Sequence, residues 1–206
     1  MYLTLSEFGV SFEVAQEINK RLEATKENGF VKLDKIIDVV KELSGYDTIK
    51  IAFADFNFDK NAKKAGAMLN TKVTEDGKKE AFIAVNTLNN AKVQRFSIAH
   101  ELGHLITGAE AYDYETPNNG KFTISSQINS DITCILDEQC KENEFLMAEQ
   151  ISNIFAVLVL IPDEITIKQL RENAEDLSSR YGVTIDALYS KMMLSASKFN
   201  ETINND

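Results

Sequence analysis

The sequence predicts an α+β fold in which a small, mainly antiparallel sheet packs on helices. Apolar residues recur at helical spacing in the first 45 residues and again after residue 142, whereas between residues 49 and 86 they alternate as they do in strands. In addition, a helix that carries a closely spaced pair of histidines follows the last of these strands. This order of elements indicates helices, then a sheet, then a helix with chemistry on it.

Two amphipathic helices are expected near the start of the chain. Residues 11–27 and 32–43 each place apolar side chains on one face, and the dipeptides Asn28-Gly29 and Ser44-Gly45 are typical helix ends. We interpret both helices as packing elements of the scaffold.

Alternating apolar residues then predict strands at 49–53, 56–58 and 80–86, with a weaker candidate at 65–73. Asp76-Gly77 is a turn signal. We expect a sheet of about three strands whose last member leads directly into the next helix.

That helix, residues 96–106, contains the motif His-Glu-x-x-His. His100 and His104 are four residues apart, so a helix presents both rings on nearly the same face, where they can bind one zinc ion. Glu101 lies one position further round, better placed to take a proton from water on the metal than to be a third ligand. The alternative is two core histidines, but two buried neutral imidazoles would each need hydrogen-bond partners.

Residues 142–161 predict a helix that becomes apolar all round in its second half, so it should run through the core. An unpaired carboxylate there is costly, and a cation beside Glu149 removes that cost. We therefore expect Glu149 to be the third zinc ligand, with water in the fourth position. Asn153, one turn later, is expected to accept the free N–H of a ligand histidine, preferably His100. Glu144 is the rival ligand, and a Glu149 side chain that reaches solvent is the other alternative.

Residues 107–141 lack periodicity and form a long insertion between the two ligand helices. Such a stretch either covers a site or is a surface excursion. No third histidine is present to stabilise a tetrahedral oxyanion, so the metal alone, Arg95 or a tyrosine must do so. Tyr112, Tyr114 and Tyr181 are the candidate tyrosines, and the sequence does not choose among them.

Composition predicts a soluble, cytoplasmic protein. A chain of 206 residues with 44% hydrophobic content can bury a core, and a net charge of −10 argues against nucleic acid as a direct partner. The first residues lack a secretory signal, and the longest apolar run, 154–161, is too short to span a membrane. Cys134 and Cys140 do not form a disulfide framework, which fits a reducing compartment.

The last 41 residues, 166–206, predict a small helical element packed on a main domain of residues 1–165. Segments 165–173, 174–181 and 185–193 read as helices with helix-turn-helix-like spacing. Five basic and six acidic residues are present in this region, so it offers no phosphate-binding face. We expect a packing or protein-recognition role.

The stretch Arg-Phe-Ser-Ile-Ala-His-Glu-Leu-Gly-His, residues 95–104, resembles the metal motif of the ImmA/IrrE family of metallopeptidases, which are zincins. Glu149, Asn153 and the run 155–162, which ends in proline, resemble the second signature of that family. Residues 181–188 resemble its small C-terminal helical element. The gap between the two signatures is longer than is usual in the family, and a serine stands at position 152 where alanine is common.

This resemblance implies a zincin-like fold, zinc as the cofactor and an endopeptidase of bacteria and their mobile genetic elements. It implies an antirepressor whose protein partner is a helix-turn-helix transcriptional repressor that it cleaves. The alternative is a non-proteolytic zinc-containing regulator that only binds a repressor or another protein, and the retention of Glu101 weighs against it. A DNA-binding antirepressor acting through residues 174–193 is disfavoured by the acidic balance of that region.

Overall fold

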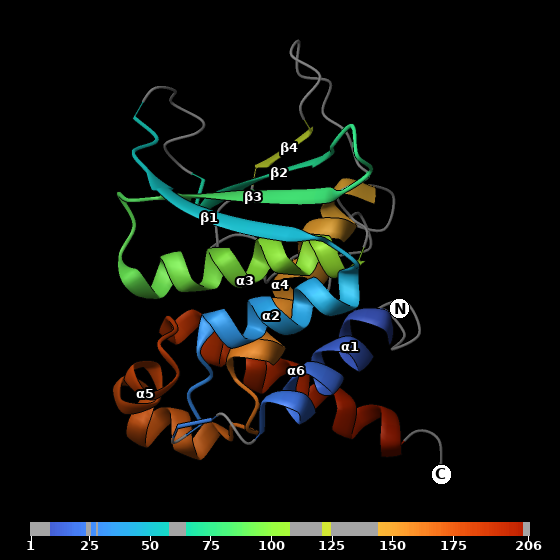
Figure 1. Cartoon of the computed structure of the whole chain (residues 1–206). Coiled ribbons are helices and arrows are strands. Elements are labelled where there is room, and N and C mark those ends of the chain that lie inside the picture. Colours follow the sequence, from blue (N-terminus) through green and yellow to red (C-terminus); the bar gives the residue numbers. More distant parts are fainter. Residues whose placement is uncertain are drawn as a thin grey trace.

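The computed structural model describes residues 9–23, 26–27, 29–57, 65–107, 121–124 and 144–203. The elements are α1 (Gly9–Leu22), α2 (Leu33–Ser44), β1 (Thr48–Ala54), β2 (Ala67–Val73), β3 (Lys79–Asn86), α3 (Ala91–Thr107), β4 (Lys121–Ile124), α4 (Glu144–Leu160), α5 (Ile167–Tyr181) and α6 (Ile185–Ile203). The sheet forms one layer, and the helices lie on one side of it with α3 directly beneath the strands (Figure 1). None of the described helices is both long enough and apolar enough to cross a membrane.

The described strands form one mixed sheet in the order β1-β3-β2-β4. β1 pairs with β3 in parallel, whereas β2 pairs with both β3 and β4 in antiparallel fashion. The predicted α+β fold with a small, mainly antiparallel sheet is therefore confirmed. The sheet has one strand more than expected, because β4 lies within the stretch 107–141 that the sequence predicted to be irregular. Four residues are too few to show a clear alternation of apolar and polar side chains.

α3 packs against the sheet because one face of β3 is apolar. Ala81, Ile83 and Val85 are buried, while Phe82 between them is exposed on the opposite face. α3 contacts β2 and β3. Its first turn is fixed by Asn90, whose side-chain oxygen accepts hydrogen bonds from the backbone N–H groups of the second and third residues that follow it. As predicted, the chain leads from β3 directly into α3, the helix that carries the His-Glu-x-x-His motif.

Several boundaries differ from those expected. α1 ends at Leu22, five residues earlier than predicted, and α3 begins at Ala91 rather than at residue 96. The first five residues of α3, 91–95, include three polar side chains and gave no apolar periodicity. The two helices expected at 165–173 and 174–181 are found as the two parts of α5, which meet at a kink where Asn173 is non-helical (φ −141°, ψ 25°), the predicted break. The strand expected at 56–58 is absent from its described part, residues 56–57.

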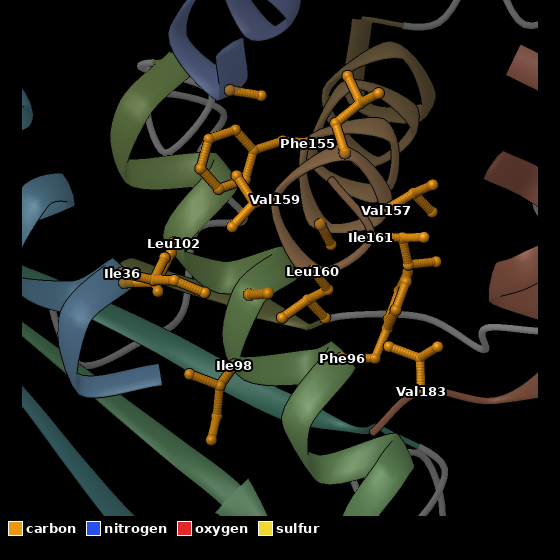
Figure 2. Packing of buried hydrophobic residues seen from close by; sticks show 14 of the residues in the cluster. Ile36, Phe96, Ile98, Leu102, Phe155, Val157, Val159, Leu160, Ile161 and Val183 are labelled. Atoms are coloured by element: carbon orange, nitrogen blue, oxygen red, sulfur yellow. The ribbon is translucent and has the colours of Figure 1, made fainter. Parts of the chain in front are cut away.

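One hydrophobic cluster contains residues of the sheet, of α3 and of the helices that precede and follow α3 in the chain. Figure 2 shows Phe155 and Leu160 of α4 directed toward α3, and Val183 of the α5–α6 connection near Phe96. Leu188 of α6 belongs to the same cluster. The C-terminal helices therefore pack on the rest of the molecule, while a domain boundary at residue 165 stays a prediction. Tyr112, Tyr114, Cys134 and Cys140 lie outside the described residues.

Arg95 is a buried cation that ties α3 to two distant parts of the chain. Its Nε donates a hydrogen bond to the carbonyl of Tyr181 at 3.2 Å, and its Nη2 donates one to the carbonyl of Val31. The guanidinium also lies 4.2 Å from the ring centroid of Phe30. Tyr181 is the last residue of α5, so its carbonyl has no partner within the helix and is satisfied by Arg95. Burial lowers the pKa of Arg95 to about 10.

We predict that Arg95→Ala lowers the free energy of unfolding by about 2 kcal/mol or more, because two backbone carbonyls lose their donor and the stem leaves a gap. Arg180→Ala is the matched control, since Arg180 has an exposed side chain that pairs with Asp163 at 3.5 Å. Exposed pairs contribute only about 0–1 kcal/mol. Urea unfolding of both variants checks this, and equal losses would contradict the bridging role of Arg95.

Candidate metal centre

Three buried side chains meet where α3 and α4 lie against each other. α3 provides His100 and His104, and α4 provides Glu149. Their exposed fractions are 2%, 0% and 2%. Residues four apart on a helix project to the same side, so the two imidazoles face α4 together. The arrangement is the one predicted from the His-Glu-x-x-His spacing and from the lone carboxylate on an apolar helix.

The distances within this cluster suit a metal ion. His100 Nε2 and His104 Nε2 are 3.0 Å apart, and they lie 3.2 Å from Oε2 and Oε1 of Glu149, respectively. A tetrahedral zinc with bonds of about 2.0–2.1 Å separates its ligand atoms by about 3.3 Å. The three residues therefore fit zinc with only small adjustments.

The hydrogen bonding around the cluster is incomplete without a cation. Apart from their contacts with the two rings, the Glu149 oxygens have no hydrogen-bond partner among the described residues, and Nδ1 of His104 has none there either. Buried polar groups in native proteins are almost always satisfied. A metal ion that binds the carboxylate and both ring nitrogens would remove most of this deficit.

Asn153 orients one of the two histidines. Its Oδ1 lies 2.9 Å from Nδ1 of His100, and since an amide oxygen can only accept, Nδ1–H of the ring must donate. That hydrogen bond leaves the lone pair of His100 Nε2 directed toward Glu149 and His104. The contact between Asn153 and His100 is the one that the sequence analysis anticipated.

The electrostatics of the cluster call for one positive charge. Burial alone would lower the pKa of His100, but the Glu149 carboxylate beside it raises the pKa to about 9. Burial would raise the pKa of Glu149, yet His100 and His104 hold it at about 2. Burial lowers the pKa of His104. Without a metal, Glu149 therefore stays ionised and His100 keeps a proton, and a bound metal ion would take the place of that proton.

Glu101 is fully buried on α3, next to His100 in the chain. Burial, opposed by the nearby charge of His100, raises the pKa of its carboxyl to about 8. Neither of its oxygens has a hydrogen-bond partner among the described residues. A carboxyl group with a pKa near neutrality can both accept and return a proton, which is what general acid–base chemistry requires.

The structure thus brings together all five residues singled out from the sequence, while their roles in metal binding and catalysis remain predictions. Glu144, the rival ligand, is the first residue of α4, and its side chain lies outside the part of the chain that the structure describes. Arg95 and Tyr181, considered as oxyanion stabilisers, are engaged with other groups, since the Tyr181 hydroxyl donates to Asp163 at 2.7 Å. Sequence reasoning missed the close contact of Gly103 with α4, and a glycine inside a helix was the available signal.

The α+β fold and the buried His-His-Glu cluster are consistent with a zincin-like domain. Residues 55–193 match the family model of peptidase M78, described as the IrrE N-terminal-like domain. The match covers well over half of the 206 residues, so the chain belongs to this metallopeptidase-like family. The resemblance to the ImmA/IrrE family is confirmed. A search of curated proteins found no match to this chain.

We predict one zinc per chain, with an ordered effect of three substitutions on its affinity. Glu149→Ala should weaken zinc binding most, because it removes a ligand. Asn153→Ala should weaken it roughly ten- to a hundredfold by freeing the His100 ring, as is typical of residues that support a ligand. Glu144→Ala is the control and should leave it nearly unchanged. Competition with a chelating dye gives the three affinities, and equal effects at Glu144 and Glu149 would mean that the ligand helix is misassigned.

We also predict that the metal-free protein loses stability as the pH rises from about 6.5 to 9. The folded-state pKa of His100, about 9, lies above its ordinary value of 6.5. The contribution of this group to the free energy of unfolding is therefore complete below pH 6.5 and is lost as the pH rises through 9. The raised pKa of Glu101 acts in the same direction between 4.5 and about 8. Thermal unfolding in chelator against pH measures the effect, with zinc-loaded protein as the comparison. A chelated protein as stable at pH 9 as at 6.5 would contradict this prediction.

Proposed function

We propose that this chain is a zinc-dependent endopeptidase that cleaves a cytoplasmic protein. The observation that carries the proposal is the buried cluster of His100, His104 and Glu149, with the acid–base candidate Glu101 on the same helix. Membership of the peptidase M78 family supports hydrolysis of peptide bonds over the other uses of such a site. Retention of Glu101 favours an enzyme over a regulator that only binds its partner, since a purely structural metal site needs no base.

In this proposal His100, His104 and Glu149 hold the zinc. Zinc there supplies Lewis acidity, which makes water a better nucleophile at neutral pH and polarises the scissile carbonyl. Asn153 keeps the His100 ring in the tautomer that leaves Nε2 free. The burial of all three ligand side chains limits access of bulk water, so charges in the site interact more strongly than they would at the surface.

Glu101 moves the proton. Its carboxylate takes a proton from the attacking water and then delivers it to the nitrogen of the leaving amine, so that one group acts first as base and then as acid. Its seclusion supports this role, because it makes no hydrogen bond with the described residues that would compete for the carboxylate. The proton balance closes, since the water's proton leaves with the new amine.

The substrate in this proposal is an extended peptide. The outer strands β1 and β4 each have one edge without a strand partner among the described residues, and such an edge can align a peptide through main-chain hydrogen bonds. A folded domain cannot present an extended segment, so we expect cleavage in a linker or in a locally unfolded stretch. The net charge of −10 favours a protein over a nucleic acid as substrate.

Within the class of protein substrates, we propose a helix-turn-helix transcriptional repressor encoded near this chain, which would make the enzyme an antirepressor. The resemblance of the two metal-site signatures to those of the ImmA/IrrE family is the support for this choice. A cytoplasmic location follows from the same proposal.

The test is to co-express the chain with that repressor, as the wild type and as Glu101→Gln. Glu101→Gln keeps the shape of the side chain and removes only the base, so it should keep zinc and the fold while the rate falls by a factor of about 10² or more. We expect two repressor fragments with the wild type and none with the variant, read by mass spectrometry. An intact repressor in both cases would favour the non-proteolytic regulator.

A further inference from the structure

Gly103 occupies an unfavourable place for a glycine, in the interior of α3 between the two histidines of the candidate site. Glycine in a helix interior is less stable than alanine because it loses more conformational freedom on folding. Its backbone has no positive φ, in contrast to Gly45 and Gly182, which follow the ends of helices. The requirement for glycine at position 103 must therefore come from its surroundings.

Those surroundings are the backbone of α4. A Cβ atom on residue 103 would lie 2.9 Å from Cα of Ser152, 3.2 Å from Cβ of Ser152 and 3.2 Å from Cδ1 of Phe155. Figure 2 shows the Phe155 ring projecting from α4 toward α3. A flexible side chain can move aside, but a Cα atom moves only with its helix. An added methyl group would thus push α3 and α4 apart.

The contact lies within the candidate metal site itself. On α3, residue 103 is flanked by His100 and His104, and on α4, residue 152 is flanked by Glu149 and Asn153, each at helical spacings of one or three. Two short interactions cross the same helix pair, His104 with Glu149 at 3.2 Å and His100 with Asn153 at 2.9 Å. The separation of the helices at Gly103 is therefore also the separation of the ligands.

We propose that Gly103 is a positioning residue, whose missing side chain sets the distance between the two ligand helices and thereby the affinity for zinc. The inference rests on the proposed zinc site and goes beyond its ligand set. Ordinary contact at a Cβ begins near 3.4 Å, so the 2.9 Å approach must open by about half an ångström (3.4 − 2.9). Zinc–ligand distances tolerate only about 0.2 Å. A displacement of this size should not leave all three ligands in place.

The experiment compares zinc dissociation constants of purified Gly103→Ala and wild type, measured by competition with a chelating dye. We expect Gly103→Ala to bind zinc at least tenfold more weakly while its far-ultraviolet circular dichroism stays that of the folded protein. Judged by helix propensity alone, alanine at position 103 would leave the stability of α3 unchanged or raise it. A loss of zinc affinity in Gly103→Ala would therefore come from the contact with α4.

Two controls separate this role from general damage to the core. Ser152→Ala removes a buried hydroxyl from the same contact without adding an atom, and it should stay within twofold of the wild-type affinity. Val159→Ile adds one methyl group to the buried part of α4 about 15 Å along the helix from Glu149, and it should lower the stability of the metal-free protein but not zinc affinity.

Zinc affinity of Gly103→Ala within twofold of the wild type would overturn the inference, as would an equal loss in Val159→Ile. A wild type that binds no zinc would instead remove the metal site itself, so the two failures are distinguishable. If Gly103→Ala does not fold, the double variant Gly103→Ala with Ser152→Gly is compared with Ser152→Gly alone. The double variant should bind zinc more weakly, and equal affinities would overturn the proposal.

Discussion

Two imidazoles and a carboxylate buried between two helices need a cation, and this need explains most of the structure around them. Hydrogen bonds alone do not satisfy this cluster, since the Glu149 oxygens have no polar partner besides His100 and His104 among the described residues. In the absence of a metal the cluster retains a proton on His100, whose pKa is about 9. A metal ion can take the place of that proton, because two imidazole nitrogens and a carboxylate are ligands that zinc prefers.

The rest of the fold holds α3 and α4 at the required separation. β3 supplies the apolar face beneath which α3 packs, α1 contacts α4, and Arg95 fastens α3 to Val31 and to the end of α5. These contacts come from segments on both sides of the metal-motif helix in the sequence. The C-terminal helices therefore contribute to the scaffold of the site.

Much of the site could be predicted from the sequence because its signals are local. The spacing of His100 and His104 fixes their common helix face, and Glu149 and Asn153 stand out as polar residues on an otherwise apolar helix. The fold class followed from the change of period between residues 45 and 49. What could not be predicted depends on pairing across space. β4 is too short to carry its own pattern, the parallel pairing of β1 with β3 leaves no trace in either strand, and the partners of Arg95 are 64 and 86 residues away in the chain.

The coordination of zinc in the wild-type protein tests the central claim most directly, by X-ray absorption at the zinc edge. Two histidines and a glutamate predict a first shell of nitrogen and oxygen alone at about 2.0–2.1 Å, with the outer-shell scattering of two imidazole rings. A sulfur ligand at about 2.3 Å would contradict the account, because it would place Cys134 or Cys140 on the metal in place of a predicted ligand.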